Sequence, residues 1–313
     1  MALEGLHHIT AITGDAPRNV DFYARTLGLR LVKKTVNFDQ PTVYHLYYGD
    51  EIGAAGSILT FFELPGTQVG RHGAGMVHTI QWRVGAPAAI AFWERRLAAA
   101  GVATTRADER TLAFEDPEGL RHELHAVDVA DAPLAAHADD IPAEYALLGF
   151  DGIRAYASAP ERSAELLERL GFVPGEGATP DGPGTTWTVR GVERHAHLRF
   201  EAPPGRGRRP GAGTIHHVAW SVADDAELRQ FRAVAREGGA EPTPIIDRQY
   251  FHSVYFPEPS GILFELASRD IGFEYDEPRE SLGSALKLPE QYEEERDHIE
   301  PLLTPITNPR QVV

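Results

Sequence analysis

The sequence predicts an α+β protein built from four βαβββ modules, which pair into two open, cup-shaped, β-barrel-like sheets with the helices outside. Similar strand starts recur about every 70 residues along the 313-residue chain. Each is followed by a segment with the apolar spacing of a helix, and that segment ends at glycine. Short runs that alternate apolar and polar residues then follow, as they do in β-strands.

The four modules are expected to begin alike. The first strand of each is predicted at residues 7–12, 77–82, 151–156 and 216–221. The helices are predicted at residues 16–27, 87–100, 160–170 and 225–237, and the glycines that end them are Gly28, Gly101, Gly171 and Gly238. Glycine is common at this position because it adopts the left-handed conformation that closes a helix.

Further strands are predicted after the helices, at residues 42–48, 57–63, 111–115, 121–127, 185–189, 195–201 and 253–256. A single module cannot close its sheet, so the modules should pair. We expect an N-terminal pair of βαβββ modules at 1–130, a linker at 131–145 and a C-terminal pair at 146–272. An acidic C-terminal tail follows at 273–313, with one predicted helix at 288–303. The repeat alone does not decide whether the first module pairs with the second or with the fourth.

The composition excludes several classes of function. The formal net charge is −16, so contact with nucleic acid or with an anionic membrane would be repulsive. The chain has no cysteine, which excludes disulfides, thiolate metal sites and cysteine nucleophiles. It shows neither a signal-peptide pattern at its start nor an apolar run of membrane-spanning length. We therefore expect a cytoplasmic protein without a nucleic-acid or membrane partner.

Strand alternation places two histidines and one glutamate on the concave side of the predicted sheets. On the strand at 216–221, Val218 and Trp220 belong to the face under the helix, so His217 points to the other face. The same alternation places His8 and Glu265 on the concave side. Two imidazoles and one carboxylate form a facial set that suits Fe(II) or Mn(II) and leaves positions for substrate and O₂.

A second set of residues competes for this role. His78 and Glu123 occupy similar places in the second module, and they would join His8 if the first two modules paired. The third module has Gly152 where the other modules have histidine, so a pair of modules three and four would lack one ligand. Periodicity does not choose between the two sets.

Four motifs carry a resemblance to a known family. They are His7-His8-Ile9-Thr10, His216-His217-Val218-Ala219, the segment from Arg248 to Glu265, and the tail motif Leu282-Gly283-Ser284-Ala285-Leu286-Lys287-Leu288-Pro289. Together they resemble the vicinal oxygen chelate superfamily, and most closely its dioxygenases that open hydroquinones. The resemblance extends over essentially the whole chain. It implies that His8, His217 and Glu265 bind Fe(II), with Mn(II) as the alternative ion.

The resemblance also implies roles for residues around the metal. In this sequence they would be His7, Thr10, His216, Arg248 and Tyr255. Strand alternation supports Tyr255, which shares a face with Ser253. It does not support His7 and His216 directly, because their parity is opposite to that of the ligand histidines. A β-bulge, or a position beside the ligands, would bring them to the site.

The resulting prediction is an Fe(II)-dependent ring-cleaving dioxygenase that opens a hydroquinone-type aromatic diol with O₂. The partners would be the small aromatic substrate and O₂, whereas the ring substituents (chlorine among them) and a homo-oligomeric state stay open. One alternative is a catechol extradiol dioxygenase with His195 or His197 as the acid/base residue. The others are a glyoxalase-like isomerase with Zn or Ni and a metal-free protein that binds aromatic drugs.

Overall fold

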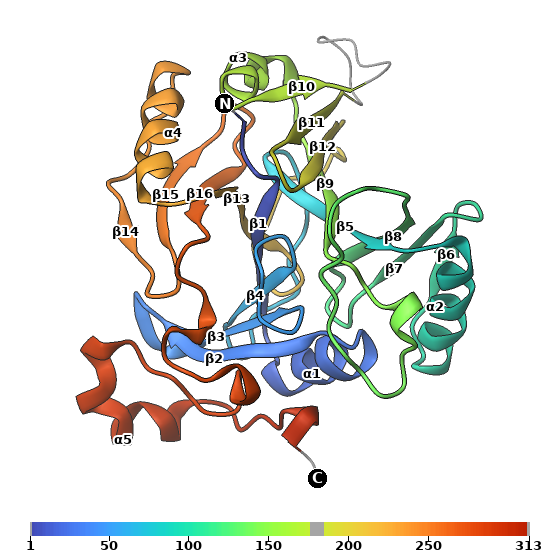
Figure 1. The fold of residues 1–313 in the computed structure, drawn as a ribbon, viewed down its shortest axis with the longest axis vertical. Helices are drawn as coiled ribbons and strands as arrows, with labels where there is room; N and C mark the ends of the chain where they lie inside the picture. The colour runs from blue at the N-terminus through green and yellow to red at the C-terminus, as the bar shows by residue number, and fades with distance from the viewer. Residues whose placement is uncertain (1, 176–184, 312–313) are drawn as a thin grey trace.

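Two eight-stranded β-sheets form the protein in the computed structural model, which describes residues 2–175 and 185–311 (Figure 1). Residue 1 and the last two residues of the predicted tail lie outside the described residues. The strands of the first sheet are β1 (Leu6–Thr13), β2 (Arg30–Asn37), β3 (Gln40–Gly49), β4 (Ile58–Glu63), β13 (Ile215–Val222), β14 (Ile246–Asp247), β15 (His252–Pro257) and β16 (Leu263–Ser268). Their spatial order is β14-β15-β16-β13-β1-β4-β3-β2.

The second sheet has the spatial order β10-β11-β12-β9-β5-β8-β7-β6. Its strands are β5 (Met76–Val84), β6 (Thr104–Arg106), β7 (Thr111–Glu115), β8 (Arg121–Ala126), β9 (Phe150–Tyr156), β10 (Phe172–Pro174), β11 (Thr186–Arg190) and β12 (His195–Glu201). The predicted α+β fold with two curled sheets is therefore confirmed, and the strands predicted at 111–115 and 195–201 have the predicted bounds.

The modules are combined crosswise. The first sheet joins module one to module four through the antiparallel pair β1–β13, and the second joins modules two and three through β5–β9. Each sheet thus takes one module from each half of the chain. The expected grouping of residues 1–130 and 146–272 into two consecutive pairs is not the grouping of the sheets, because the segment 131–145 connects two modules of the same sheet.

The helices follow the predicted positions with local differences. α2 (Pro87–Ala99) and α4 (Asp225–Glu237) are regular, whereas the first helix starts as α1 (Ala16–Val20) and continues as a π-helix, η1 (Asp21–Thr26). In that π-helix the Leu27 N–H donates to the Phe22 carbonyl at 2.9 Å, five residues back. The third begins as the 3₁₀ turn η3 (Pro160–Ser163) and continues as α3 (Ala164–Arg169). Within the described ranges no helix is both long and apolar enough to cross a membrane.

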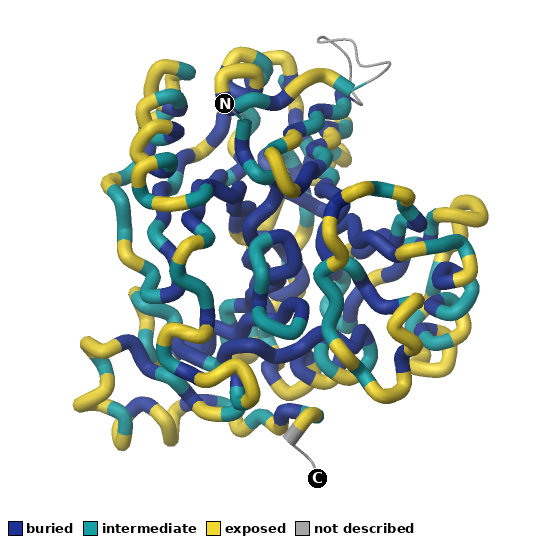
Figure 2. The backbone as a smooth tube through the Cα atoms, viewed as in Figure 1, coloured by how far each residue is buried: buried dark blue, intermediate teal, exposed yellow. Residues whose placement is uncertain are grey.

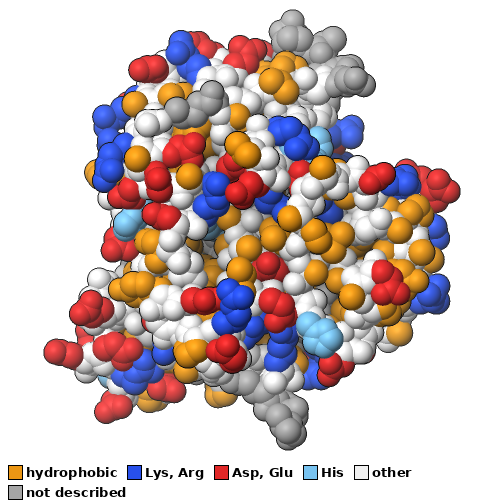
Figure 3. Space-filling model, viewed as in Figure 1, with side chains coloured by type: hydrophobic (Ala, Val, Ile, Leu, Met, Phe, Trp, Pro, Cys, Tyr) orange, Lys and Arg blue, Asp and Glu red, His pale blue; other side chains and the backbone are white. Residues whose placement is uncertain are grey.

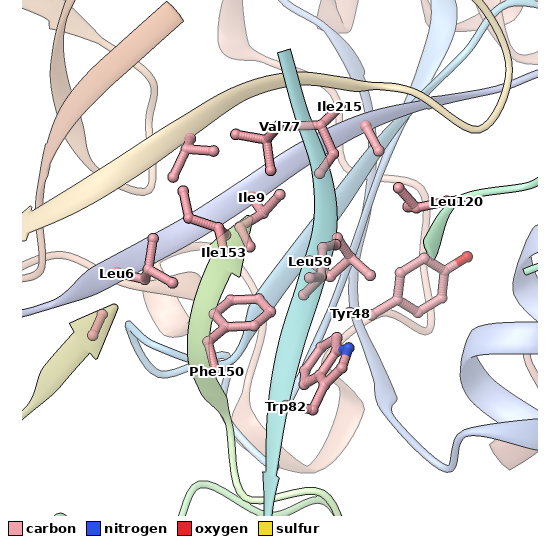
Figure 4. Packing of buried hydrophobic residues seen from close by; sticks show 14 of the residues in the cluster. Leu6, Ile9, Tyr48, Leu59, Val77, Trp82, Leu120, Phe150, Ile153 and Ile215 are labelled. Atoms are coloured by element: carbon pink, nitrogen blue, oxygen red, sulfur yellow. The ribbon is translucent and has the colours of Figure 1, made fainter. Parts of the chain in front are cut away.

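One large apolar core lies between the sheets and under the helices. Figure 4 shows side chains of the first sheet, such as Ile9 and Leu59, packed with Val77, Trp82 and Ile153 of the second. Figure 2 shows buried backbone along the central strands and exposed backbone on the helices and outer loops. On the face drawn in Figure 3, acidic and basic side chains are interspersed, so the negative charge is not gathered into one patch there.

The C-terminal tail covers the edge of the first sheet at β2. Leu286 forms a parallel bridge with Lys34, and the Lys287 N–H donates to the Lys34 carbonyl at 2.9 Å. The predicted helix at 288–303 is instead a series of short turns around one helical segment, α5 (Arg296–Ile299). Besides η3, the described residues form the 3₁₀ turns η2 (Ala143–Tyr145), η4 (Phe273–Tyr275), η5 (Arg279–Ser281), η6 (Glu290–Glu295), η7 (Glu300–Leu302) and η8 (Pro309–Gln311). The tail therefore satisfies an edge that would otherwise be open to pairing.

A buried lysine of β2 attaches this tail to the first sheet through ion pairs. The Lys33 side chain is fully buried, and its Nζ lies 2.5 Å from Asp276 Oδ1 and 2.7 Å from Glu277 Oε2. The Tyr250 hydroxyl donates to the other oxygen of Asp276 at 2.9 Å. Residues from β2, the tail and the loop before β15 thus share one charged cluster, and removal of the cation would leave Glu277 buried without a counter-charge.

We expect Lys33→Ala to lower the free energy of unfolding by about 3–5 kcal/mol, because it breaks a buried ion pair. Urea denaturation followed by circular dichroism would measure the change. Arg25→Ala is the control, since Arg25 pairs with Asp21 at 2.7 Å but both side chains are exposed, so the expected loss is below about 0.5 kcal/mol. Equal losses for both variants would contradict the role given to Lys33.

The second sheet contains a half-buried histidine, His125, between two acids. His125 Nδ1 lies 2.9 Å from Asp151 Oδ2, and its Nε2 lies 3.4 Å from Glu123 Oε2. Burial lowers the pKa of His125, but the hydrogen bonds to Asp151 and Glu123 outweigh it and raise the pKa to about 9. The imidazole is therefore a cation at neutral pH.

Because the folded chain binds this proton more tightly than the unfolded chain, the stabilisation is complete below about pH 6.5 and is lost as the pH rises towards 9. We expect the free energy of unfolding of His125→Gln to lack this part of its pH dependence, which is on the order of 2 kcal/mol. Urea midpoints measured from pH 6 to 10 would test this. His137→Gln, at an exposed histidine, should follow the wild-type curve. Parallel curves for the wild type and His125→Gln would refute the expectation.

Candidate metal centre

The three predicted ligands meet on the concave face of the first sheet. They come from β1, β13 and β16, which are consecutive in the sheet, so their side chains converge across strand neighbours. The Nε2 atoms of His8 and His217 are 3.3 Å apart, and they lie 3.2 and 3.0 Å from Glu265 Oε2. All three residues are buried. Pairing of modules one and four thus produces the predicted triad.

The Glu265 oxygen that faces the histidines fits a metal ligand. Among the described residues, Oε2 has no hydrogen-bond partner, whereas Oε1 accepts a hydrogen bond from the Ser253 hydroxyl. The nearby imidazole nitrogens approach Oε2 without the alignment of a hydrogen bond. Two atoms that bind one ion at right angles, each at about 2.1 Å, lie about 3 Å apart. The triad is therefore spaced as ligands of one octahedral ion would be.

Electrostatics keep this carboxylate ready to bind a cation. Burial alone would raise the pKa of Glu265, but the imidazoles of His8 and His217 outweigh it and hold the pKa well below its ordinary value. The carboxylate is consequently ionised at neutral pH. A buried anion whose facing oxygen lacks a hydrogen bond is costly unless a positive charge compensates it.

The first histidine of each doublet holds the second. His7 Nδ1 lies 2.9 Å from His8 Nδ1, and His216 Nδ1 lies 2.8 Å from His217 Nδ1. His7 Nε2 lies 3.1 Å from the Ser268 carbonyl, to which it donates, so His7 Nδ1 accepts the proton of His8. This arrangement leaves the Nε2 lone pair of His8 free for an ion. A register shift between Leu6 and His8 accompanies it, and both first histidines lie beside the ligands.

A cavity of about 440 Å³ opens in front of the triad. Arg248 and Tyr255 line it, as the sequence predicts: the Arg248 Nε–H donates to the Tyr255 hydroxyl at 3.3 Å, and the guanidinium lies 5.4 Å from the ring centroid. Burial and the nearby Glu265 carboxylate raise the pKa of Tyr255, so the phenol keeps its proton. The rings of Tyr255 and His217 are nearly perpendicular, with 5.7 Å between centroids.

Thr10 has a less direct position than the resemblance implies. It pairs with His217 across β1 and β13, and its hydroxyl accepts a hydrogen bond from the Thr60 hydroxyl at 2.9 Å. Thr60 in turn lies 2.8 Å from His45 Nε2. The structure therefore connects Thr10 to a side-chain network on β4 and β3.

Several cavity residues do not emerge from the sequence. They are His45 and Tyr47 of β3, Phe62 of β4, Phe251 before β15, and Asp39 of the β2–β3 turn. Alternation along β3 could have placed His45 and Tyr47 on one face. It could not have brought that face to the triad without the strand order β1-β4-β3.

The rival set His78 and Glu123 lacks the geometry of a metal site. In the central pair of the second sheet, Thr79 pairs with Arg154, as His8 pairs with Ala219 in the first. By this register His78 corresponds to His7 and not to a ligand. Glu123 forms an ion pair with Arg154, inside a cavity of about 680 Å³. This cavity is larger than the one in front of the triad, but Arg154 already compensates the charge of Glu123.

Asp151, His195 and His197 also bring candidate ligand atoms within 4.8 Å of one another. The guanidinium of Arg83 occupies this cluster, because its Nε–H donates to Asp151 at 3.2 Å and its Nη2 lies 3.4 Å from His195 Nε2. Asp131 adds a second acid at 2.7 Å from His195 Nδ1. The positive charge that an ion would supply is therefore already present. These histidines lie on the second sheet, away from the triad.

Comparisons with known proteins identify the family of the chain. A family model described as the Glyoxalase/Bleomycin resistance protein/Dioxygenase superfamily matches residues 5–124 and 149–266. The "Putative ring-cleaving dioxygenase MhqO" of Bacillus subtilis is 40% identical over 305 residues, 96% of each chain. The "Chlorohydroquinone/hydroquinone 1,2-dioxygenase" of Sphingobium indicum is 32% identical over 95% of each chain.

A solved structure shows the same architecture over nearly the whole chain. The crystal structure of a "putative dioxygenase" from Bacillus subtilis superposes with a TM-score of 0.91 at 37% identity, over 98% of each chain. The names of these relatives agree with the predicted class of enzyme, a ring-cleaving dioxygenase. The chain belongs to the glyoxalase/bleomycin resistance protein/dioxygenase superfamily.

Proposed function

We propose that this protein is a dioxygenase that opens the ring of a hydroquinone-type diol with O₂, using Fe(II) held by His8, His217 and Glu265. One observation carries the proposal: the ionised, buried Glu265 faces two imidazoles with an oxygen that lacks a hydrogen bond, and these imidazoles, of His8 and His217, line a cavity of about 440 Å³. The names of the relatives support the reaction and the substrate class. The set of two nitrogens and one oxygen favours iron, with Mn(II) as the alternative.

When bound, Fe(II) supplies Lewis acidity towards the diol and the redox chemistry that activates O₂. The protein supplies position and charge. His7 and His216 fix the tautomers of the two ligand histidines through the Nδ1 contacts. His216 is exposed on the surface, whereas His7 is buried.

Arg248 and Tyr255 face the place where negative charge develops on the substrate oxygens. Since Arg248 donates to the Tyr255 oxygen, the phenol proton remains available for the substrate. A positive guanidinium behind a neutral phenol stabilises an oxyanion better than water does, because neither group has to reorient. Phe62 and Phe251 line the same cavity and provide an apolar surface for the aromatic ring.

Two further predictions concern the location of the protein and its self-association. We propose that the reaction takes place in the cytoplasm, and fractionation of cells that make the protein would test this. Self-association also stays a prediction, and light scattering of the purified protein would decide it.

We expect rapid O₂ uptake when protein purified without air is supplied with Fe(II) and hydroquinone, because the cavity then holds all reactants. An oxygen electrode gives the rate, and protein without added metal is the control. Uptake with catechol but not with hydroquinone would replace the substrate class. No uptake with either diol, together with bound zinc or nickel in elemental analysis, would favour an isomerase instead.

We expect His217→Ala to lower the iron content of reconstituted protein from about one ion per chain to near zero, because two ligands do not hold Fe(II) against buffer. Elemental analysis after gel filtration measures the content, and circular dichroism checks the fold. His78→Ala is the matched control, since His78 is a buried histidine of the other sheet. Loss of iron in His78→Ala with retention in His217→Ala would reject the assigned site.

A further inference from the structure

A chain of hydrogen bonds runs along the wall of the cavity that β3 and β4 form. The Tyr47 hydroxyl lies 2.8 Å from His45 Nδ1, His45 Nε2 lies 2.8 Å from Thr60 Oγ1, and the Thr60 hydroxyl donates to Thr10 at 2.9 Å. All four side chains are buried. His45 and Tyr47 line the cavity, so the chain connects the cavity wall to β1, the strand of His8.

The direction of these hydrogen bonds follows from the proton that Thr60 donates. Because Thr60 gives its only proton to Thr10, it must accept a hydrogen bond from His45 Nε2. The remaining nitrogen of a neutral imidazole is an acceptor, so Tyr47 donates to His45 Nδ1. Both nitrogens of His45 are then occupied. The Tyr47 oxygen, in contrast, retains the capacity to accept a hydrogen bond from a ligand.

This wall lies across the cavity from Arg248 and Tyr255. β15, which carries Tyr255, borders β16 on one side of the triad, whereas β3 is separated from β1 by β4 on the other side (Figure 1). Since neighbouring strands are about 4.8 Å apart, the backbone of Tyr47 is about 10 Å along the sheet from β1. Tyr47 therefore belongs to the far wall, and Tyr255 belongs to the wall beside Glu265.

The distance between the two hydroxyls differs between 1,2-diols and 1,4-diols. A 1,2-diol carries both on adjacent carbons, so both lie at the same end of the ring. A 1,4-diol carries them at opposite ends, so one hydroxyl at the triad directs the other to the far wall. Asp39 is an unsuitable partner there, because it is exposed and paired with Arg248 at 3.4 Å. An oxygen with a spare acceptor position at the far wall distinguishes the two diols.

We propose that Tyr47 accepts a hydrogen bond from the second hydroxyl of a 1,4-diol, and that His45 positions Tyr47 for this contact. The inference rests on the proposed function and identifies the group that selects para-diols over ortho-diols. His45 Nδ1 accepts a hydrogen bond from the Tyr47 hydroxyl, so the phenol oxygen is available to the ligand as an acceptor. The Thr60–Thr10 pair fixes the imidazole from the other side.

The test compares the binding of hydroquinone with that of phenol, which lacks the second hydroxyl. Calorimetry without air, on the Fe(II)-loaded protein, gives both dissociation constants. We expect the wild type to bind hydroquinone about five- to tenfold more tightly than phenol, the worth of one hydrogen bond. In Tyr47→Phe hydroquinone should bind no better than phenol, and the affinity for phenol should be unchanged.

Tyr48→Phe is the matched control, because Tyr48 is the next residue of β3 and its hydroxyl donates to Asn19 in the core at 2.8 Å. This variant should keep the wild-type preference. A preference retained in Tyr47→Phe, or absent from the wild type, would overturn the inference. Oxygen uptake is measured separately, so failure of the proposed reaction is distinguishable from failure of this contact.

Discussion

The antiparallel pairing of β1 with β13 is the contact on which the rest of the structure depends. It joins the first module to the last and brings His8 within 3.3 Å of His217, 209 residues further along the chain. β16 then adds Glu265 in parallel register beside β13. The cavity, the histidine doublets and the wall formed by β3 all take their positions from this central pair.

The two sheets compensate buried acid in different ways. On the second sheet, arginines reach the acids directly, as Arg154 reaches Glu123 and Arg83 reaches Asp151. On the first sheet, no guanidinium or ammonium contacts Glu265 among the described residues, and only two imidazoles face it. The same module therefore supports either an internal ion-pair network or a buried carboxylate that faces imidazoles instead of arginine or lysine. The difference lies in a few concave-face residues and not in the fold.

The sequence was informative wherever local periodicity determines the result. Strand alternation placed His217 and Glu265 on one face, and apolar spacing predicted the helix Asp225–Glu237 with its observed bounds. Long-range pairing has no such signal, so module order and the contribution of Tyr47 needed the structure. Parity was misleading at His7 because a register shift lies between Leu6 and His8. The first helix also departs from the predicted α-helix, because Asp21–Thr26 form a π-helix.

The crosswise arrangement of modules has a consequence for the order in which the protein is made. The strands of the second sheet end at Glu201, so they are complete while β13 and β16 are still to be synthesised. The second sheet therefore has all its strands before the first sheet does, and β1 has no β13 to pair with until residues 215–222 have been made. The triad of His8, His217 and Glu265 is accordingly completed late in synthesis, and a chain that ends before β16 lacks Glu265.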